Sequence, residues 1–172
     1  MTTCVDPLVV GGVIGDVIDL FVPMVTMSVH FGSKHINNGC EITPSLAANL
    51  PTVNISGRRF DRFTLVMTDP DAPSPSEPTL RELVHWVVVN IPGSTDASHG
   101  QELVPYMGPK PPLGIHRYVL VLFHQQSEFR AVAPPTTRAN FSTRDFAVQC
   151  ELGLPVAVAY FNSQKQPAAR RR

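Results

Sequence analysis

Proline is the feature that most restricts how this chain can fold. Of the 172 residues, 17 are proline, about twice the usual share of roughly one residue in twenty. Proline has no backbone N–H, and its ring clashes with the preceding turn of a helix, so long helices cannot hold so many of them. The sequence therefore predicts a fold of strands and shaped loops with only short helices.

Composition and charge exclude several classes of protein. A length of 172 residues fits one domain, and the 43% share of hydrophobic residues excludes intrinsic disorder. Because 14 basic residues balance 14 acidic ones, no net field draws the chain onto a polyanion, and we expect no direct binding of nucleic acid. We take residues 1–166 as the domain. We expect residues 167–172 to be a basic, disordered tail, either a solvated terminus or a nuclear-import or phosphate contact.

The sequence carries no pattern typical of a membrane or secreted protein. The apolar run at residues 8–15 is far shorter than the roughly 20 residues of a membrane span. No basic residue precedes it, so it does not resemble a signal peptide. The three cysteines, Cys4, Cys40 and Cys150, are odd in number and scattered. We therefore expect a reduced, intracellular protein with no transmembrane segment.

Alternating and continuous apolar runs predict the strands. Residues 25–31 alternate between apolar and polar side chains, and Asn38-Gly39 is expected to form the turn after them. Runs that are apolar on both faces indicate strands buried inside a sandwich or under helices. Further strands are predicted at residues 52–55, 63–68, 84–91, 118–124 and 156–161.

Two short helices are predicted from capping residues. Asp6 followed by Pro7 is typical of a helix start, and Ser142 with Asp145 three residues on is another. Gly153 supplies a stop after the second helix. The sequence thus predicts a mainly β, single domain with short helices at its margins.

Polar residues gather where three predicted strands meet loops. Asp69 and Asp71 follow one buried strand, His85 begins a second, and His116 and Tyr118 begin a third. If these strands are neighbours, the side chains converge at one end of a sheet.

Two-residue alternation also assigns faces to these side chains. It places His85 on the same face as Val87 and Val89, and His116 on the same face as Tyr118. Arg117 is a candidate ion-pair partner for Asp71 or Glu82.

The predicted cluster suits an anion such as phosphate. Imidazole, phenol and backbone N–H groups are all donors, and the proline-rich loop at residues 106–112 can present its N–H groups rigidly. Two alternatives use His85, His116 and Asp69: a hydrolase with a histidine as general base, or a metal site. The sequence offers no Gly-x-Ser-x-Gly nucleophile motif and no cysteine beside a histidine. We expect no catalytic residue, no metal and no cofactor.

Several motifs, in order and spacing, resemble the phosphatidylethanolamine-binding protein family. The similarity runs from Asp6 to about Gln164 and is greatest to the plant branch, in particular the Mother of FT and Terminal Flower group. The motifs are Asp69-Pro70-Asp71-Ala72-Pro73, His85-Trp86, Tyr106-x-Gly108-Pro109, Gly114-Ile115-His116-Arg117-Tyr118 and Asn140-Phe141-Ser142-Thr143-Arg144.

The resemblance implies a fold and a pocket. The fold is a two-sheet β-sandwich with a small anion pocket at one edge and a cis peptide bond between Ala72 and Pro73. The pocket positions of the family that match this sequence are Asp69, Asp71, His85, His116 and Tyr118, with Gly108 and Pro111 on the rim.

The resemblance also implies a role. Plant members are non-enzymatic regulators of seed germination, dormancy or flowering, with links to abscisic acid signalling. They act in the cytoplasm and nucleus with 14-3-3 proteins and, through them, bZIP transcription factors. The implied pocket ligand is a phosphorylated small molecule, a phospholipid headgroup or a phosphopeptide. A phospholipid-headgroup carrier is the alternative within this resemblance.

Some positions depart from the family's pattern. Leu83 stands where flowering promoters carry Tyr and repressors His, so neither assignment follows. At the 14-3-3 contact positions Pro92 matches, whereas His99 replaces a usual Phe and Glu128 replaces a usual Arg. Arg130 lies close enough in sequence to supply the missing positive charge.

Overall fold

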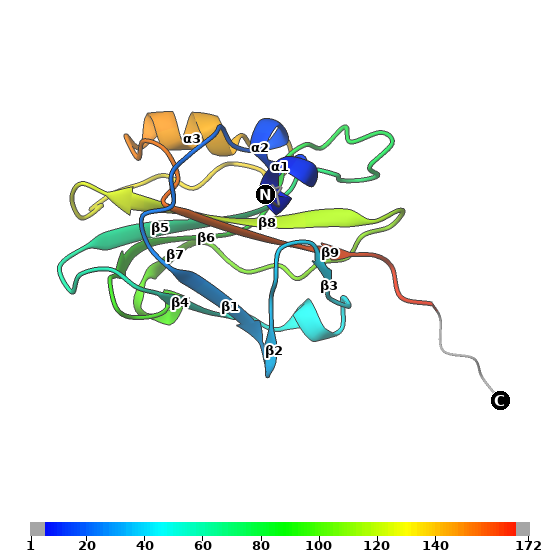
Figure 1. The fold of residues 1–172 in the computed structure, drawn as a ribbon. Helices are drawn as coiled ribbons and strands as arrows, with labels where there is room; N and C mark the ends of the chain where they lie inside the picture. The colour runs from blue at the N-terminus through cyan, green and yellow to red at the C-terminus, as the bar shows by residue number, and fades with distance from the viewer. Residues whose placement is uncertain (1–5, 168–172) are drawn as a thin grey trace, which may run out of the picture.

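The computed structural model describes residues 6–167, which form three layers. A six-stranded sheet lies in the middle, a three-stranded sheet covers one of its faces, and the helices cover the other (Figure 1). The small sheet has the strand order β2-β1-β4, with β1 at Met27–Phe31, β2 at Lys34–His35 and β4 at Thr52–Ile55. The predicted mainly β, two-sheet fold is confirmed.

The large sheet has the strand order β3-β9-β8-β5-β6-β7. Its strands are β3 at Cys40–Glu41, β5 at Arg62–Asp69, β6 at Leu83–Pro92, β7 at Gln101–Val104, β8 at His116–Gln125 and β9 at Ala157–Ser163. Neighbouring strands are antiparallel except β3 and β9, which are parallel. Because β5 ends where β6 and β8 begin, the three polar segments predicted from the sequence meet at one edge of this sheet.

An apolar core lies on each face of the large sheet. Between the two sheets, residues such as Phe31 and Val53 of the small sheet pack against Leu65 and Leu120 of the large one. On the opposite face, residues such as Val66 pack under the helices. This explains why the central strands are apolar on both sides: each face is covered.

The helices begin where the capping residues predict. Helix α1 at Pro7–Val10 is capped by Asp6, whose side chain accepts a hydrogen bond from the backbone N–H of Leu8. Helix α3 at Thr143–Gln149 is capped by Ser142, which accepts from the N–H of Asp145. Short α2 at Val13–Asp16 follows α1, and two 3₁₀ turns, η1 at Leu46–Ala48 and η2 at Ala97–His99, lie in loops. These short helices, together with loop residues such as Phe129 and Phe141, cover the outer face of the large sheet.

Short edge strands and one turn differ from the prediction. The hairpin after β1 turns at Gly32 and Ser33, because Phe31 pairs with Lys34. Asn38 and Gly39 do form a turn, but it lies further along and bonds to β9 through Tyr160. Strands β2, β3 and β7 were not predicted, because so few residues give no clear alternation and pairing with a neighbour decides their conformation.

Two further predictions concern the ends of the chain and the membrane. No helix among residues 6–167 is long and apolar enough to cross a membrane. Residues 168–172 of the predicted basic tail lie outside the described residues. The division of the chain at residue 166 stays a prediction.

Asn90 of β6 holds the loop that follows β8. Its side-chain oxygen accepts from the backbone N–H of Phe129 and from Gln125 Nε2, both at 2.8 Å, and its Nδ2 donates to the Phe129 carbonyl at 2.7 Å. Asn90 adopts a φ of 59°, a left-handed conformation that asparagine tolerates better than most residues. One side chain thus attaches residues 126–131 to the large sheet.

We expect Asn90→Ala to lower the free energy of unfolding by about 1–3 kcal/mol. It leaves the backbone N–H and carbonyl of Phe129 without these partners and removes one of the two acceptors of Gln125 Nε2, which keeps the Ser127 carbonyl. Asn90→Gly removes the same bonds but permits the left-handed backbone, so it should cost less than the alanine variant. Urea unfolding measures both. Wild-type stability in Asn90→Ala would contradict this role.

Candidate functional site

A cavity of about 210 Å³ opens at the edge of the large sheet where β5 ends and β6 and β8 begin. Side chains from these three strands and from two proline-rich loops form its wall. The lining residues are Asp69, Ala72, Pro73, Leu80, Leu83, His85, Met107, Gly108, Lys110, Pro111, Pro112, His116 and Tyr118. The structure therefore brings together every predicted pocket residue except Asp71.

A β-bulge places His85 on this wall. Met67 pairs with Trp86, but the next residue of β5, Thr68, pairs with Val84, so His85 is an extra residue in β6. Its ring lies edge-on to Tyr118, with the ring centroids 5.2 Å apart. A bulge of this kind redirects a side chain next to a site.

The face predicted for His85 from alternation is therefore wrong. Val87 and Val89 pack in the core beneath the helices, as alternation along β6 requires. His85 instead contacts Tyr118, which belongs to the core between the sheets. The extra residue breaks the two-residue period, and neither the composition nor the spacing of the strand signals it.

The hydrogen bonds of His85 decide its protonation. Nδ1 lies 2.6 Å from the carbonyl oxygen of Met107. A carbonyl can only accept, so Nδ1 carries the hydrogen. The other ring nitrogen, Nε2, is buried and has no partner among residues 6–167. Burial lowers the pKa of His85 and outweighs the hydrogen bond to Met107 and the charge of Asp69, which raise it. The ring is therefore neutral near pH 7.

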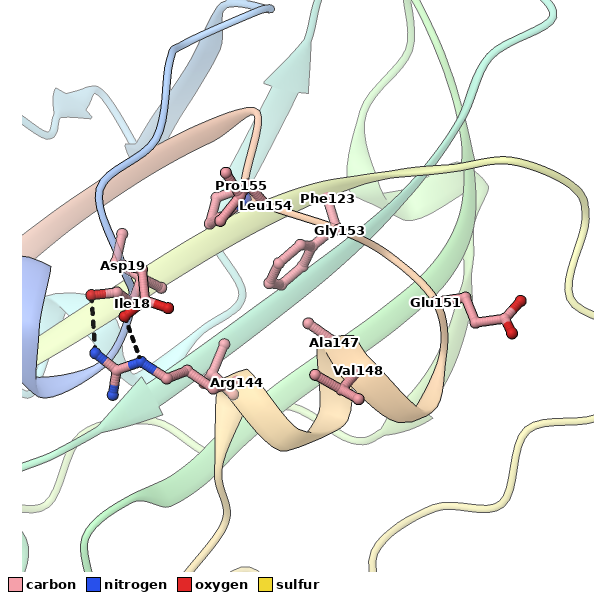
Figure 2. Close-up of a pocket in the computed structure, with 11 residues that line it drawn as sticks. Ile18, Asp19, Phe123, Arg144, Ala147, Val148, Glu151, Gly153, Leu154 and Pro155 are labelled. Atoms are coloured by element: carbon pink, nitrogen blue, oxygen red, sulfur yellow. Dashed lines mark hydrogen bonds and ion pairs between the residues drawn. The ribbon is translucent and has the colours of Figure 1, made fainter.

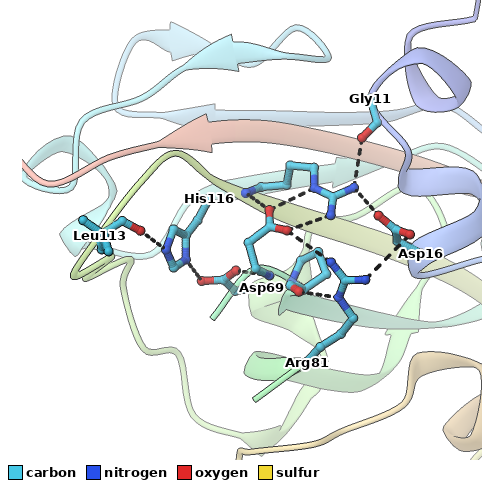
Figure 3. A network of polar contacts seen from close by, with 9 residues as sticks. Gly11, Asp16, Asp69, Arg81, Leu113 and His116 are labelled. Carbon is cyan, nitrogen blue, oxygen red and sulfur yellow. Dashed lines mark hydrogen bonds and ion pairs between the residues drawn. The ribbon is translucent and has the colours of Figure 1, made fainter. Parts of the chain in front are cut away.

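His116 uses both of its ring nitrogens within the protein. Nδ1 lies 2.7 Å from Asp69 Oδ2, and Nε2 lies 2.8 Å from the Leu113 carbonyl (Figure 3). Because both partners accept, the ring is an imidazolium. Burial disfavours that charge, but the hydrogen bond and charge of Asp69 outweigh burial and raise the pKa of His116 above its usual 6.5. His116 has no free nitrogen for a ligand.

Both carboxylate oxygens of Asp69 also have hydrogen-bond partners within the protein. One carboxylate oxygen accepts from His116, and the other accepts from the backbone N–H of Asp71 at 2.8 Å. Asp69 and His116 are 2% and 0% exposed, respectively, so they form a buried ion pair that joins β5 to β8. This pair orients the cavity wall.

Asp71 lies behind the cavity and holds the N-terminal segment. Its carboxylate accepts from Arg117 Nη2 at 2.7 Å and Nε at 2.9 Å, and Arg117 also reaches Asp16 of α2 at 2.9 Å. Burial would raise the pKa of Asp71, but Arg117 outweighs burial and lowers it. Of the two partners proposed for Arg117, Asp71 is the one that the structure contains. Asp71 does not line the cavity.

The remaining polar lining comes from Tyr118 and Lys110. Burial, the charge of Asp69 and a hydrogen bond to that carboxylate raise the pKa of Tyr118, so its hydroxyl keeps its hydrogen. Lys110 is exposed and lines the same cavity. It was not among the predicted site residues, although its position between Gly108 and Pro111 was the available signal. Leu83 also lines the cavity.

The geometry bears on both alternative chemistries. Asp69 orients His116 and not His85, and neither ring nitrogen of His116 is free to act as a base. No serine, threonine or cysteine lines the cavity to serve as a nucleophile. Within residues 6–167 no group of three His, Cys, Asp or Glu side chains could hold a metal ion.

Comparison with known proteins agrees with this geometry. The sequence profile described as "Phosphatidylethanolamine-binding protein" matches residues 26–161. The chain belongs to the phosphatidylethanolamine-binding protein family. The cis peptide bond between Ala72 and Pro73 that the resemblance implies is also present.

Within this family the chain is similar to plant proteins. It is 60% identical to "Protein MOTHER of FT and TFL1 homolog 2" of Oryza sativa subsp. japonica, over the full length of both chains. It is 49% identical to "Protein TERMINAL FLOWER 1" of Arabidopsis thaliana, over 99% of this chain and 97% of that one. The predicted membership in the plant branch is confirmed.

Solved structures of the family share the fold. A carboxypeptidase Y inhibitor, crystallised with its cognate proteinase, gives a TM-score of 0.84 at 25% identity and covers 93% of this chain and 94% of its own. A phosphatidylethanolamine-binding protein from Plasmodium vivax gives 0.77 at 22% identity, over 93% and 96% of the two chains. The second likeness shows the fold alone.

A second cavity of about 330 Å³ lies between α3 and the segments at residues 18–19 and 153–155 (Figure 2). Phe123, Ala147 and Leu154 make its wall mainly apolar, and an ion pair between Arg144 and Asp19 crosses one end. None of the predicted site residues lines it. It holds no buried polar atom that lacks a partner.

The four predicted partner-surface residues lie on connected elements of this family fold. Pro92 ends β6, and His99 lies in η2, which packs against β6. Glu128 and Arg130 are exposed on either side of Phe129, whose backbone bonds to Asn90 two residues before Pro92. The side chain of Asn90 thus brings Glu128 and Arg130 to the end of β6.

We expect Asp69→Ala to lower the free energy of unfolding by about 3 kcal/mol at pH 6, because it leaves the buried imidazolium of His116 unpaired. A base with a raised folded pKa stabilises the native state below its unfolded pKa and loses that contribution as the pH rises through the folded value. The difference between wild type and variant should therefore narrow at pH 9.

Thermal and urea unfolding at both pH values measure this difference. His124→Ala is the matched control, because it removes an exposed His–Asp pair with Asp61 and should cost less than about 1 kcal/mol. Equal stability of Asp69→Ala and wild type at pH 6 would rule out the charged pair.

Proposed function

We propose that this chain is a non-enzymatic plant regulator whose cavity binds a phosphate-bearing ligand. One observation carries the ligand proposal: His85 Nε2 is buried on the cavity wall and lacks a partner among residues 6–167. A buried polar atom without a partner costs free energy, so such a site favours a ligand that supplies the missing hydrogen bond.

The charges around the cavity support an anion. The imidazolium of His116 neutralises Asp69, so the buried pair carries no net charge. Lys110 then adds a positive charge to the cavity lining. Apolar residues such as Leu83 form much of the rest of the wall, which suits an ester carrying a phosphate better than a free ion.

The absence of a nucleophile from the cavity lining supports regulation rather than turnover. Similarity to proteins named for the Mother of FT and Terminal Flower group supports a role in plant development. We assign the chain to the control of seed germination, dormancy or flowering, with abscisic acid signalling as the connected pathway. We place its action in the cytoplasm and nucleus.

We further propose that the surface around Pro92, His99, Glu128 and Arg130 contacts 14-3-3 proteins and, through them, bZIP transcription factors. This proposal comes from the family resemblance of these positions. The exposed carboxylate of Glu128 opposes it by adding a negative charge beside an acidic partner groove. Exposed Arg130, two residues away, offers a compensating positive charge.

We expect inorganic phosphate to bind to the wild-type protein and His85→Ala to weaken this binding by about tenfold to a hundredfold. Loss of a hydrogen bond to a charged group costs about 1.5–3 kcal/mol. Calorimetric titration at pH 6 measures the effect. His124→Ala, a variant at an exposed histidine of β8, should bind phosphate like wild type. Unchanged affinity in His85→Ala would remove His85 from the site.

We expect wild-type binding to a 14-3-3 protein to be weak and salt-sensitive, and Glu128→Arg to strengthen it. Reversing an exposed charge chiefly speeds association, and salt screens the gain. Surface plasmon resonance at low and high salt tests this. Arg130→Ala should weaken binding if Arg130 supplies the positive charge. Tight binding that neither substitution alters would show that this surface is not the contact.

A further inference from the structure

The hydrogen bonds of His85 define which ligand the cavity can accept. Its Nδ1 hydrogen is directed to the Met107 carbonyl, 2.6 Å away. The remaining nitrogen of a neutral ring, Nε2, is therefore a hydrogen-bond acceptor. His85 is 2% exposed, and its Nε2 has no partner among residues 6–167. A ligand that satisfies His85 Nε2 must therefore donate a hydrogen bond to it.

Most phosphate oxygens cannot fill this position, because they only accept hydrogen bonds. A phosphodiester with one negative charge has no O–H group. A phosphate monoester with one negative charge has the same charge and one P–OH hydrogen. Because of this hydrogen, the monoester can donate a hydrogen bond to His85 Nε2 and the diester cannot.

We propose that the cavity selects phosphate monoesters in their singly protonated form over phosphodiesters. This inference rests on the proposed phosphate-binding function. In the complex, the P–OH group donates to His85 Nε2, and the remaining phosphate oxygens accept from the Lys110 ammonium group. A phosphorylated side chain or small molecule then fits, whereas the diester headgroup of a membrane phospholipid does not.

The charged groups around His85 keep the proton on the ligand. His116 of β8 and Arg138 from the loop after β8 are both positive and oppose a charge on the His85 ring. Arg138 Nη1 donates to the His85 carbonyl at 3.1 Å, which fixes this residue's backbone as well. The Asp69 carboxylate favours protonation of His85, but burial and the two cations outweigh it.

The same groups disfavour a doubly charged phosphate. Asp69 lies on the cavity wall and repels a second negative charge, although His116 neutralises it in part. Lys110 balances a single negative charge, and the Tyr118 hydroxyl is neutral. A singly charged phosphate therefore matches the charge and the hydrogen-bond pattern together.

Phenyl phosphate and methyl phenyl phosphate test this proposal, because they differ by one methyl group that replaces the acidic hydrogen. We expect the monoester to bind about tenfold more tightly at pH 6, since the diester leaves the buried nitrogen unpaired. Between pH 6 and pH 8 monoester affinity should fall about fiftyfold, the drop in the singly protonated fraction for a second pKa near 6. Calorimetry of the full chain measures both affinities.

Proton uptake gives an independent readout that needs no variant. At pH 8 the free monoester is a dianion, so binding should take up about one proton per ligand. Titrations in two buffers of different ionisation enthalpy measure that number. Binding of phenyl phosphate without proton uptake at pH 8 would overturn the proposal.

Two variants separate the hydrogen bond from the charge. His85→Asn keeps a donor for the Met107 carbonyl but removes the Nε2 acceptor, so the monoester preference and its pH dependence should both be lost. Lys110→Met should weaken the binding of both ligands by a similar factor and keep the preference for the monoester. Thermal unfolding confirms that each variant is folded.

The outcomes distinguish this inference from the proposed function. Equal affinity for the two ligands at pH 6, or tighter binding of the diester, overturns the monoester selection and leaves an anion site. It would also favour phospholipid headgroups as ligands. If neither ligand binds between pH 5.5 and pH 8, the phosphate-binding function fails together with the inference.

Discussion

The buried ion pair between Asp69 and His116 is the interaction on which the cavity depends. Removing two charges from water is costly, and the cost is offset here because Asp71 and Leu113 supply further hydrogen-bond partners. The pair joins the end of β5 to the start of β8 and leaves His116 no free nitrogen. His85 is therefore the one histidine on the wall with an unpartnered ring nitrogen among the described residues.

Backbone geometry then directs that nitrogen. The bulge in β6 places His85 beside Tyr118, and the loop that contains Met107 holds the ring through its Nδ1 hydrogen. Arg138 donates to the carbonyl groups of both Val84 and His85. Because Met107 and Tyr118 hold the ring and Arg138 holds the backbone, the protonation state of His85 is set before a ligand arrives. The site therefore discriminates by hydrogen-bond pattern as well as by charge.

The loop after β8 connects the two proposed surfaces. Near its start, Phe129 is bonded to Asn90, and Glu128 and Arg130 are exposed beside it. Further along, Arg138 binds the backbone of His85 and the Pro105 carbonyl. This one loop therefore carries two of the four proposed partner contacts and also holds the backbone of the cavity wall.

The sequence by itself determined the elements whose causes are local. Asp6 and Ser142 marked helix starts because their side chains cap the backbone, and doubly apolar runs marked central strands because both sheet faces are covered. Tertiary structure alone decided the bulge that turns His85, because an extra residue depends on pairing with β5. It also decided that Asp71 pairs with Arg117 and that His85 Nε2 stays open, since hydrogen-bond partners come from segments far apart in the chain.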